Sequence, residues 1–180
     1  MKQVFMSMIA LLVAMSVNAQ KRYLNEPTTP FSQGKAYVGA SFSGTDLSYS
    51  GITEGHLGIQ GKVGYFFADN LMGLAQLGYE NSVKKEGNPT TLSLAAGGRY
   101  YIQQNGLYLG AGLKYKHAEN YNDVLPNFQL GYAFFLGRTV TLEPELYLDV
   151  STKKFDYTCY GLRVGIGVYL FKDQYKIKTT

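Results

Sequence analysis

Residues 158–171 read Thr-Cys-Tyr-Gly-Leu-Arg-Val-Gly-Ile-Gly-Val-Tyr-Leu-Phe. Every even-numbered position from Tyr160 to Leu170 is apolar, whereas the odd-numbered positions carry glycine, Arg163 or Tyr169. Successive side chains of a β-strand point to opposite faces, so this stretch predicts a strand with one apolar and one polar face. The same alternation predicts seven further strands, at 35–43, 55–67, 71–83, 91–102, 107–117, 126–136 and 139–150. The sequence therefore predicts an all-β protein.

The apolar faces of these strands carry no charged residue, and their aromatic residues gather near the strand ends. Aromatic side chains mark one end in three strands and the other end in another four; they are Tyr65, Phe67, Tyr100 and Phe134, and Phe42, Tyr79, Tyr115 and Tyr160. Two aromatic belts around an aliphatic band are typical of a wall that faces a lipid bilayer. A soluble barrel with an apolar interior would show the same alternation. The belts favour a barrel with apolar side chains outside and polar side chains inside. The predicted strands are also long enough to span a bilayer when tilted, which favours the same arrangement.

The strands repeat as four hairpin units. Gly64, Gly97, Gly131 and Gly167 end alternate strands at spacings of 33, 34 and 36 residues. Short turns at 68–70, 104–106 and 137–138 alternate with longer segments near 44–54, 84–90, 118–125 and 151–157. An open sheet edge would leave unpaired backbone groups in lipid, so a membrane sheet must close. We therefore predict an eight-stranded antiparallel up-and-down transmembrane β-barrel, with the short turns on the periplasmic side.

The two ends of the chain differ from the repeat. Lys2, an apolar run at 4–17 and a small residue at Ala19 predict a signal peptide over residues 1–19. Residues 20–34 hold two prolines and no alternation, which indicates a periplasmic linker; residues 35–171 form the predicted barrel, and residues 172–180 a periplasmic tail. The net charge of +4 and the lack of any Lys/Arg run longer than two do not favour a nucleic-acid partner. The single cysteine, Cys159, excludes an intramolecular disulfide, and no spacing suggests a metal or cofactor.

Three segments carry a resemblance to a known family: Gly-Tyr-Phe-Phe-Ala-Asp-Asn-Leu-Met-Gly-Leu at 64–74, Leu-Glu-Pro-Glu-Leu-Tyr at 142–147, and the closing strand at 161–171. They resemble the small outer-membrane β-barrel family, to which the OmpX and OmpA barrels belong. The resemblance implies the outer membrane of a Gram-negative-type cell, with membrane lipid and the barrel-insertion machinery as partners. Family barrels often end on the aromatic residue of the closing strand, whereas this chain continues from Lys172 to Thr180.

The predicted interior of the barrel is charged. Lys35 and Lys116 face inward on the same alternation as eight further residues, which we call the lumen charge network: Lys62, Glu80, Arg99, Lys114, Glu143, Glu145, Asp149 and Arg163. Buried charges need partners, so one interpretation is a set of ion pairs that fills a narrow barrel. A second interpretation is a charged path for ions or small solutes.

Three functions are compatible with such a barrel. We expect a monomer with a structural or surface-interaction role, in which the loop near 43–53 could contact a partner. The alternative is a narrow, porin-like channel. A lipid-modifying enzyme ranks third, because it needs a histidine beside a serine and an acid. His56 would lie near Ser41 and Ser43 if the first hairpin is in register, and His117 is close to Glu119, but neither histidine is part of a His-x-Ser motif. We therefore expect no catalytic residues.

Overall fold

The structure, a computed structural model, describes residues 30–48, 53–54, 56–82, 90–102, 105–118, 121–153 and 158–170. Side chains at 44–48, 53–54, 56–57, 82 and 121 are not described. The predicted signal peptide, most of the predicted linker and the predicted tail lie outside the described residues. Among the residues described, there is no helix of sufficient length and apolar character to cross a membrane.

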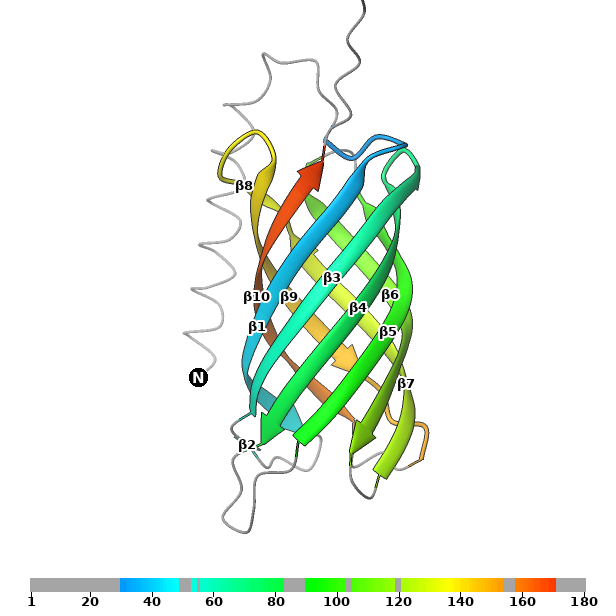
Figure 1. Cartoon of the computed structure of the whole chain (residues 1–180), viewed down its shortest axis with the longest axis vertical. Coiled ribbons are helices and arrows are strands. Elements are labelled where there is room, and N and C mark those ends of the chain that lie inside the picture. Colours follow the sequence, from blue (N-terminus) through cyan, green and yellow to red (C-terminus); the bar gives the residue numbers. More distant parts are fainter. Residues whose placement is uncertain are drawn as a thin grey trace, which may run out of the picture. The chain divides into compact units, whose positions relative to one another are not determined.

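The described part of the chain is an antiparallel sheet closed into a barrel (Figure 1). Its long strands follow each other round the wall in chain order, and pairing between the last and first closes the ring. The strands are β1 (Ala36–Ser48), β2 (Thr53–Glu54), β3 (His56–Ala68), β4 (Leu71–Ser82), β5 (Thr90–Tyr101), β6 (Leu107–Ala118), β7 (Tyr121–Tyr132), β8 (Phe134–Phe135), β9 (Val140–Asp149) and β10 (Cys159–Leu170). β2 and β8 are two-residue strands that pair with β1 and β9. The predicted eight-stranded barrel is confirmed.

The short turns form one end of the barrel, which we call the turn end. Asn70 joins β3 to β4 with φ 65°, and Gly106 precedes β6 with φ 92°. Asparagine and glycine adopt this left-handed backbone at low cost, which is why a chain reversal of a few residues can form at these positions. β1 starts and β10 stops at the same end, so the opposite end carries the longer connections and is called the outer end.

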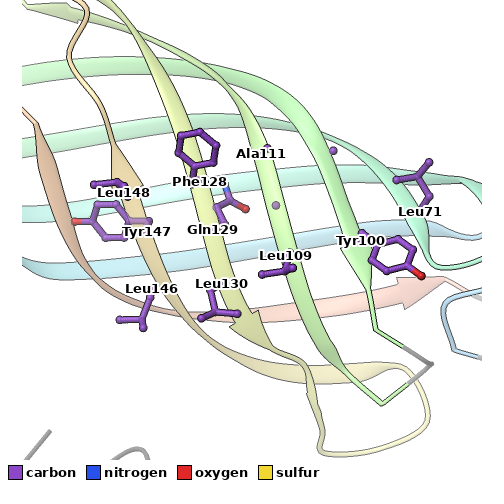
Figure 2. Close-up of a pocket in the computed structure, with 12 residues that line it drawn as sticks. Leu71, Tyr100, Leu109, Ala111, Phe128, Gln129, Leu130, Leu146, Tyr147 and Leu148 are labelled. Atoms are coloured by element: carbon purple, nitrogen blue, oxygen red, sulfur yellow. The ribbon is translucent and has the colours of Figure 1, made fainter.

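The strand faces are sorted as the alternation predicts. The outward side chains of the aliphatic band include Leu109, Leu130 and Leu146, which are seen in Figure 2 and are about half exposed. Lys62 and Arg99 are buried inside the barrel. Both predicted belts contain exposed aromatic rings, with one exception. Phe134 is only 8% exposed and its ring centroid lies 4.4 Å from that of Tyr132.

Two predicted strand boundaries are wrong. The strand predicted at 126–136 begins at Tyr121, so the connection expected near 118–125 shrinks to the short segment after Ala118. The first strand, predicted to end at residue 43, continues to Ser48. Asn122 and Asp123 are residues typical of turns, which explains the first error.

Among the residues that the structure describes, no strand lies beside the outer part of β7 on the β9 side, because its pairing with β9 starts at Asn127. The segment that follows β9 covers this edge instead. The backbone N–H of Val150 donates to the carbonyl of Pro126 at 2.9 Å, and the hydroxyl of Thr152 donates to the carbonyl of Val124 at 3.0 Å. Hydrogen bonds from this segment thus replace those of a neighbouring strand, which protects an edge that would otherwise be open.

The buried side chain of Asp123 also holds the segment after β9 against β7. Its carboxylate accepts hydrogen bonds from the hydroxyl of Ser151 at 2.6 Å and from the hydroxyl of Thr152 at 2.9 Å. It also accepts the backbone N–H of Val124 at 2.9 Å. An aspartate that favours a turn in isolation belongs to a strand here, because it pairs with Lys116 of β6 and its carboxylate has donors in the segment that follows β9.

Candidate functional site in the barrel lumen

Strand β9 supplies the acidic side of the lumen. Alternate residues of this strand point inward, and each of them is polar and buried: Thr141, Glu143, Glu145, Tyr147 and Asp149. This spacing of two follows directly from the pleat of a strand. Cations from β3, β5, β6 and β10 face these inward side chains of β9. The ion pairs between the two groups determine the electrostatics of the lumen.

Glu145 is the centre of the lumen charge network. Its Oε2 atom accepts hydrogen bonds from Lys62 Nζ at 3.0 Å and from Arg99 Nη2 at 2.9 Å. The same atom accepts from the hydroxyl of Tyr108 at 3.0 Å, while Oε1 accepts from Arg163 Nη1 at 2.9 Å. β9 pairs with β7 and β10, so the bonds from β3 and β5 cross the lumen. One buried carboxylate therefore closes the middle of the barrel.

Glu143 forms a second crossing one step nearer the turn end. Its Oε2 atom accepts from the hydroxyl of Tyr37 at 2.8 Å and from Arg99 Nη1 at 3.1 Å. Its Oε1 atom accepts from the hydroxyls of Thr141 at 2.8 Å and Tyr169 at 3.0 Å. Arg99 thus bridges both glutamates through two guanidinium nitrogens, a planar arrangement that lysine could not reproduce.

A further set of ion pairs lies toward the outer end. Lys114 Nζ is 2.7 Å from Asp149 Oδ2 and 3.6 Å from Glu80 Oε1. Lys116 Nζ is 3.3 Å from Glu80 Oε2. The amide of Asn127 donates to the second carboxylate oxygen of Asp149. Both carboxylates thereby have cationic partners, which reduces the cost of removing them from water.

Aromatic rings lie against the two arginines of the network. The guanidinium carbon of Arg99 is 4.0 Å from the ring centroid of Tyr108, and that of Arg163 is 4.0 Å from the ring centroid of Tyr147. Cation–π contacts of this kind stabilise a desolvated guanidinium. Two buried polar atoms in this region, Arg99 Nε and the hydroxyl oxygen of Tyr147, have no hydrogen-bond partner in the described structure.

The structure places all eight residues of the predicted lumen charge network on the inside of the barrel, and each of them is part of an ion pair. Lys35 differs from the prediction: it precedes β1 and is only half-buried at the turn end. Burial lowers the pKa of Lys35, and the nearby charge of Asp69 opposes this shift. Lys116 does face inward, where it contacts Glu80.

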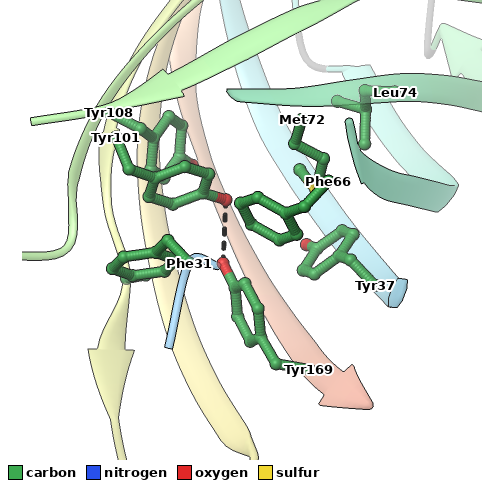
Figure 3. Close-up of a cluster of buried hydrophobic side chains, with 9 residues drawn as sticks. Phe31, Tyr37, Phe66, Met72, Leu74, Tyr101, Tyr108 and Tyr169 are labelled. Atoms are coloured by element: carbon green, nitrogen blue, oxygen red, sulfur yellow. Dashed lines mark hydrogen bonds between the residues drawn. The ribbon is translucent and has the colours of Figure 1, made fainter. Parts of the chain in front are cut away.

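Aromatic side chains close the lumen at the turn end (Figure 3). We call this group the aromatic plug; its buried rings are Phe31, Tyr37, Phe66, Tyr101, Tyr108 and Tyr169. The ring of Phe31 stacks on that of Tyr101 with centroids 4.0 Å apart and meets the ring of Tyr169 edge-on at 5.5 Å. The hydroxyls of Tyr101 and Tyr169 are hydrogen-bonded at 2.8 Å. The plug therefore lies directly beneath the layer of Glu143 and Arg99.

Phe31 belongs to the segment that the sequence assigned to a linker, yet it is fully buried. Backbone bonds hold this segment to the β3–β4 turn: Asn70 N donates to the carbonyl of Phe31 at 2.7 Å, and Gly34 N donates to that of Phe66 at 2.9 Å. Gln33 adds two more, since its N–H donates to Asp69 and its side-chain amide to the carbonyl of Phe67, each at 2.9 Å. Sequence reasoning missed this residue because Phe31 lies outside any alternating stretch.

Phe31→Leu is expected to lower the free energy of unfolding by about 1 kcal/mol, since leucine keeps the apolar volume but loses the stacked ring of Tyr101. Urea titration of the protein in liposomes, followed by far-UV circular dichroism, measures the change. Phe67→Leu is the matched control, because Phe67 is attached to the same turn but faces outward. Equal losses in both variants would show that the plug is not specifically packed.

Little free volume is found between these layers. A pocket inside the barrel, between Gln76, Asn127 and Gln129, measures only about 10 Å³. That is the space of about one water molecule, and the three amides supply the polar partners that a buried water needs. At this point the lumen has no room for a solute larger than water.

The remaining polar candidates do not gather into a reactive site in the described structure. His117 faces outward at the outer end, where its Nδ1 atom is hydrogen-bonded to the side-chain oxygen of Asn122. The side chain of His56 lies outside the described ones. Cys159 is half-buried and is not part of a disulfide. Within the described ranges, no group of three or more His, Cys, Asp or Glu residues could hold a metal ion.

A comparison with protein families resolves what kind of barrel this is. The family described as "Outer membrane protein beta-barrel domain" matches residues 7–176, which is nearly the whole chain. The chain belongs to this family. It is an outer-membrane protein, and the apolar outer wall described above is the surface that such a barrel presents to lipid.

Solved structures of the same architecture agree with the family. Neisserial surface protein A is 15% identical with a TM-score of 0.57, over 74% of this chain and 95% of that one. The N-terminal β-barrel domain of Pseudomonas aeruginosa OprF is 16% identical with a TM-score of 0.55, over 77% and 98%. The outer membrane protein Ail of Yersinia pestis is 12% identical with a TM-score of 0.52, over 77% and 100%. No curated protein sequence matches the chain significantly. At such low identities the likeness concerns the fold alone.

Proposed function

We propose that this outer-membrane barrel has a structural or surface-interaction role and does not conduct solutes. The observation that carries the proposal is the coordination of Glu145, which receives Lys62, Arg99 and Arg163 from three different strands. A solute moving along the axis would have to separate these buried charges from each other. Breaking a buried pair costs several kcal/mol, so the network is an effective barrier.

Two further features support a sealed barrel. The aromatic plug lies between the turn end and the charged layer, so a second, apolar barrier follows the first. The size of the barrel agrees with this, because eight strands enclose a space that side chains can fill. At the outer end of the barrel, Ser151 and Thr152 hydrogen-bond to Asp123 of β7. These bonds hold the start of β7 in place, next to the connections through which a partner could be contacted.

Single-channel recording of the folded protein in a planar bilayer tests the proposal. We expect a silent bilayer for the wild type, even though the protein is inserted. Insertion is established separately by the shift between heated and unheated samples on SDS gels and by protection from added protease. Arg99→Ala serves as the comparison, because it removes the bridge between Glu143 and Glu145.

Steady conductance steps in the wild type would contradict the proposal. If Arg99→Ala altered the size or the ion selectivity of such steps, the lumen charge network would be the lining of a narrow channel. Steps that appear only in Arg99→Ala would instead support the proposal, because they would show that the ion pairs are the seal.

A further inference from the structure

The outer wall of the barrel contains a groove that the lumen does not explain (Figure 2). Its volume is about 670 Å³, within the range of small-molecule sites. It crosses the wall from β4 to β9 and opens away from the lumen. The outward side chains beside it are apolar, among them Tyr100, Leu109, Phe128 and Leu148, and each is exposed. Gln129 and Tyr147 also border it, but their side chains are buried inside the barrel.

Small residues form the floor of the groove. Gly98 and Ala111 are neighbours in the register of β5 and β6, and Phe128 follows Ala111 on β7. A Cβ atom added at Gly98 would meet nothing closer than the carbonyl oxygen of Met72 at 3.7 Å. Gly73, the neighbour of Gly98 on β4, differs, because the ring of Phe67 covers it: an added Cβ would lie 2.2 Å from a carbon of this ring.

The position of the groove limits what can occupy it. It lies in the lipid-facing wall, and no charged side chain borders it. The hydroxyl of Tyr100 lies at one end of it, and the other exposed side chains along it are hydrocarbon. A polar solute would therefore find few partners along the groove, whereas a flexible hydrocarbon chain can follow its course and cover the bare backbone of Gly98. The chain then buries apolar surface on the floor and on the side chains beside it, which makes the contact more favourable than contact with a smooth wall.

We propose that the groove holds one acyl chain of a phospholipid from the periplasmic leaflet. Leu71 directly follows the β3–β4 turn and is paired with Tyr100, so the groove begins at the turn end. Tyr100 belongs to the aromatic belt there, and tyrosine favours the headgroup level of a bilayer. Short turns lie on the periplasmic side of such barrels, where the leaflet consists of phospholipid. The headgroup lies near Tyr100, and the chain runs over Gly98 and Ala111 toward Phe128.

Native mass spectrometry of the full chain in detergent micelles, with phosphatidylethanolamine added stepwise, tests the proposal. The wild type retains one phospholipid per chain. Gly98→Leu fills the floor and lowers the affinity by at least about tenfold, because several methylene contacts are lost. The control is Gly61→Leu, since Gly61 is an equally open outward glycine, with nothing closer than 3.9 Å to an added Cβ, and does not border the groove. It leaves the affinity unchanged.

Ala111→Leu fills the same floor from β6 and repeats the test if Gly98→Leu does not fold, as judged by heat-dependent migration on SDS gels. Equal loss of lipid in Gly98→Leu and Gly61→Leu would overturn the proposal, because the lipid would then coat the wall without a defined site. Retention of lipopolysaccharide in preference to phosphatidylethanolamine would also overturn it. So would a wild-type dimer that Gly98→Leu dissociates, because the groove would then bind a second copy of the chain.

Discussion

Glu145→Ala is expected to lower the free energy of unfolding by about 3–5 kcal/mol, which is the usual cost of breaking a buried ion pair by removing one partner. The carboxylate is 1% exposed and joins Lys62, Arg99 and Arg163. Without it, three buried cations lose the carboxylate that they share, and their burial keeps bulk water from replacing it. Glu143 retains its contact with Arg99 but makes none with the other two in the described structure. The large effect follows from this shared dependence on a single acid.

Urea titration in liposomes, followed by tyrosine fluorescence and circular dichroism, measures the loss. Glu145→Gln separates charge from size, because glutamine fills the same volume without neutralising the cations. Glu80→Gln is the matched control: Glu80 contacts two lysines but is 13% exposed, so water compensates part of the change and the loss is smaller. An unchanged free energy for Glu145→Ala would mean that water already reaches the cations, and it would also contradict a sealed lumen.

Leu77→Arg is expected to cost about 2–4 kcal/mol, the penalty for a cation on the lipid face near the middle of a bilayer. Leu77 is the central outward residue of β4 and is 58% exposed to the surroundings of the barrel. Its register neighbours, Gly61 and Leu94, also face outward, so the new charge finds no partner in the wall. In an aqueous environment the same substitution would be nearly harmless, which makes it a direct test of what surrounds the barrel.

The fraction of folded protein after insertion into liposomes, and its urea midpoint, measure this effect. Val124→Arg is the control for depth. Val124 is 45% exposed on the same lipid-facing wall, but it lies toward the outer end of β7, where we expect the edge of the bilayer. There the expected cost is only about 0–1 kcal/mol. Equal costs at both positions would contradict the depth assigned to β4, and no cost at either position would contradict a lipid-facing wall.

The wall of the barrel could be predicted from local patterns. A period of two decides which side of the sheet each residue faces, and this rule placed all eight members of the lumen charge network inside. It could not reveal their partners. Lys62 and Glu145 are 83 residues apart, and their contact depends on the diameter of the closed ring and on the stagger between β3 and β9.

The errors have a common physical origin. Asn122 and Asp123 indicate a turn locally, but they pair with His117 and Lys116 of β6, and hydrogen bonds from Thr152 and Ser151 hold the other side of β7. Phe31 follows a proline-containing stretch without alternation, yet the stacked ring of Tyr101 provides a site that buries it. In both cases some of the partners, Ser151 and Thr152 for β7 and Tyr101 for Phe31, are remote in sequence, so no local pattern records them.

By itself, the sequence determined the strands, the two faces of the wall and the closure of the sheet, because each depends on alternation between neighbouring residues and on the need to pair every backbone group in lipid. Only the tertiary structure decided which side chains meet in the lumen and where the lipid-facing wall has a groove. Both depend on side chains from different strands that meet when the ring closes: Glu145 with its three cations, Phe31 with the tyrosines, and the bare backbone of Gly98 beside Ala111.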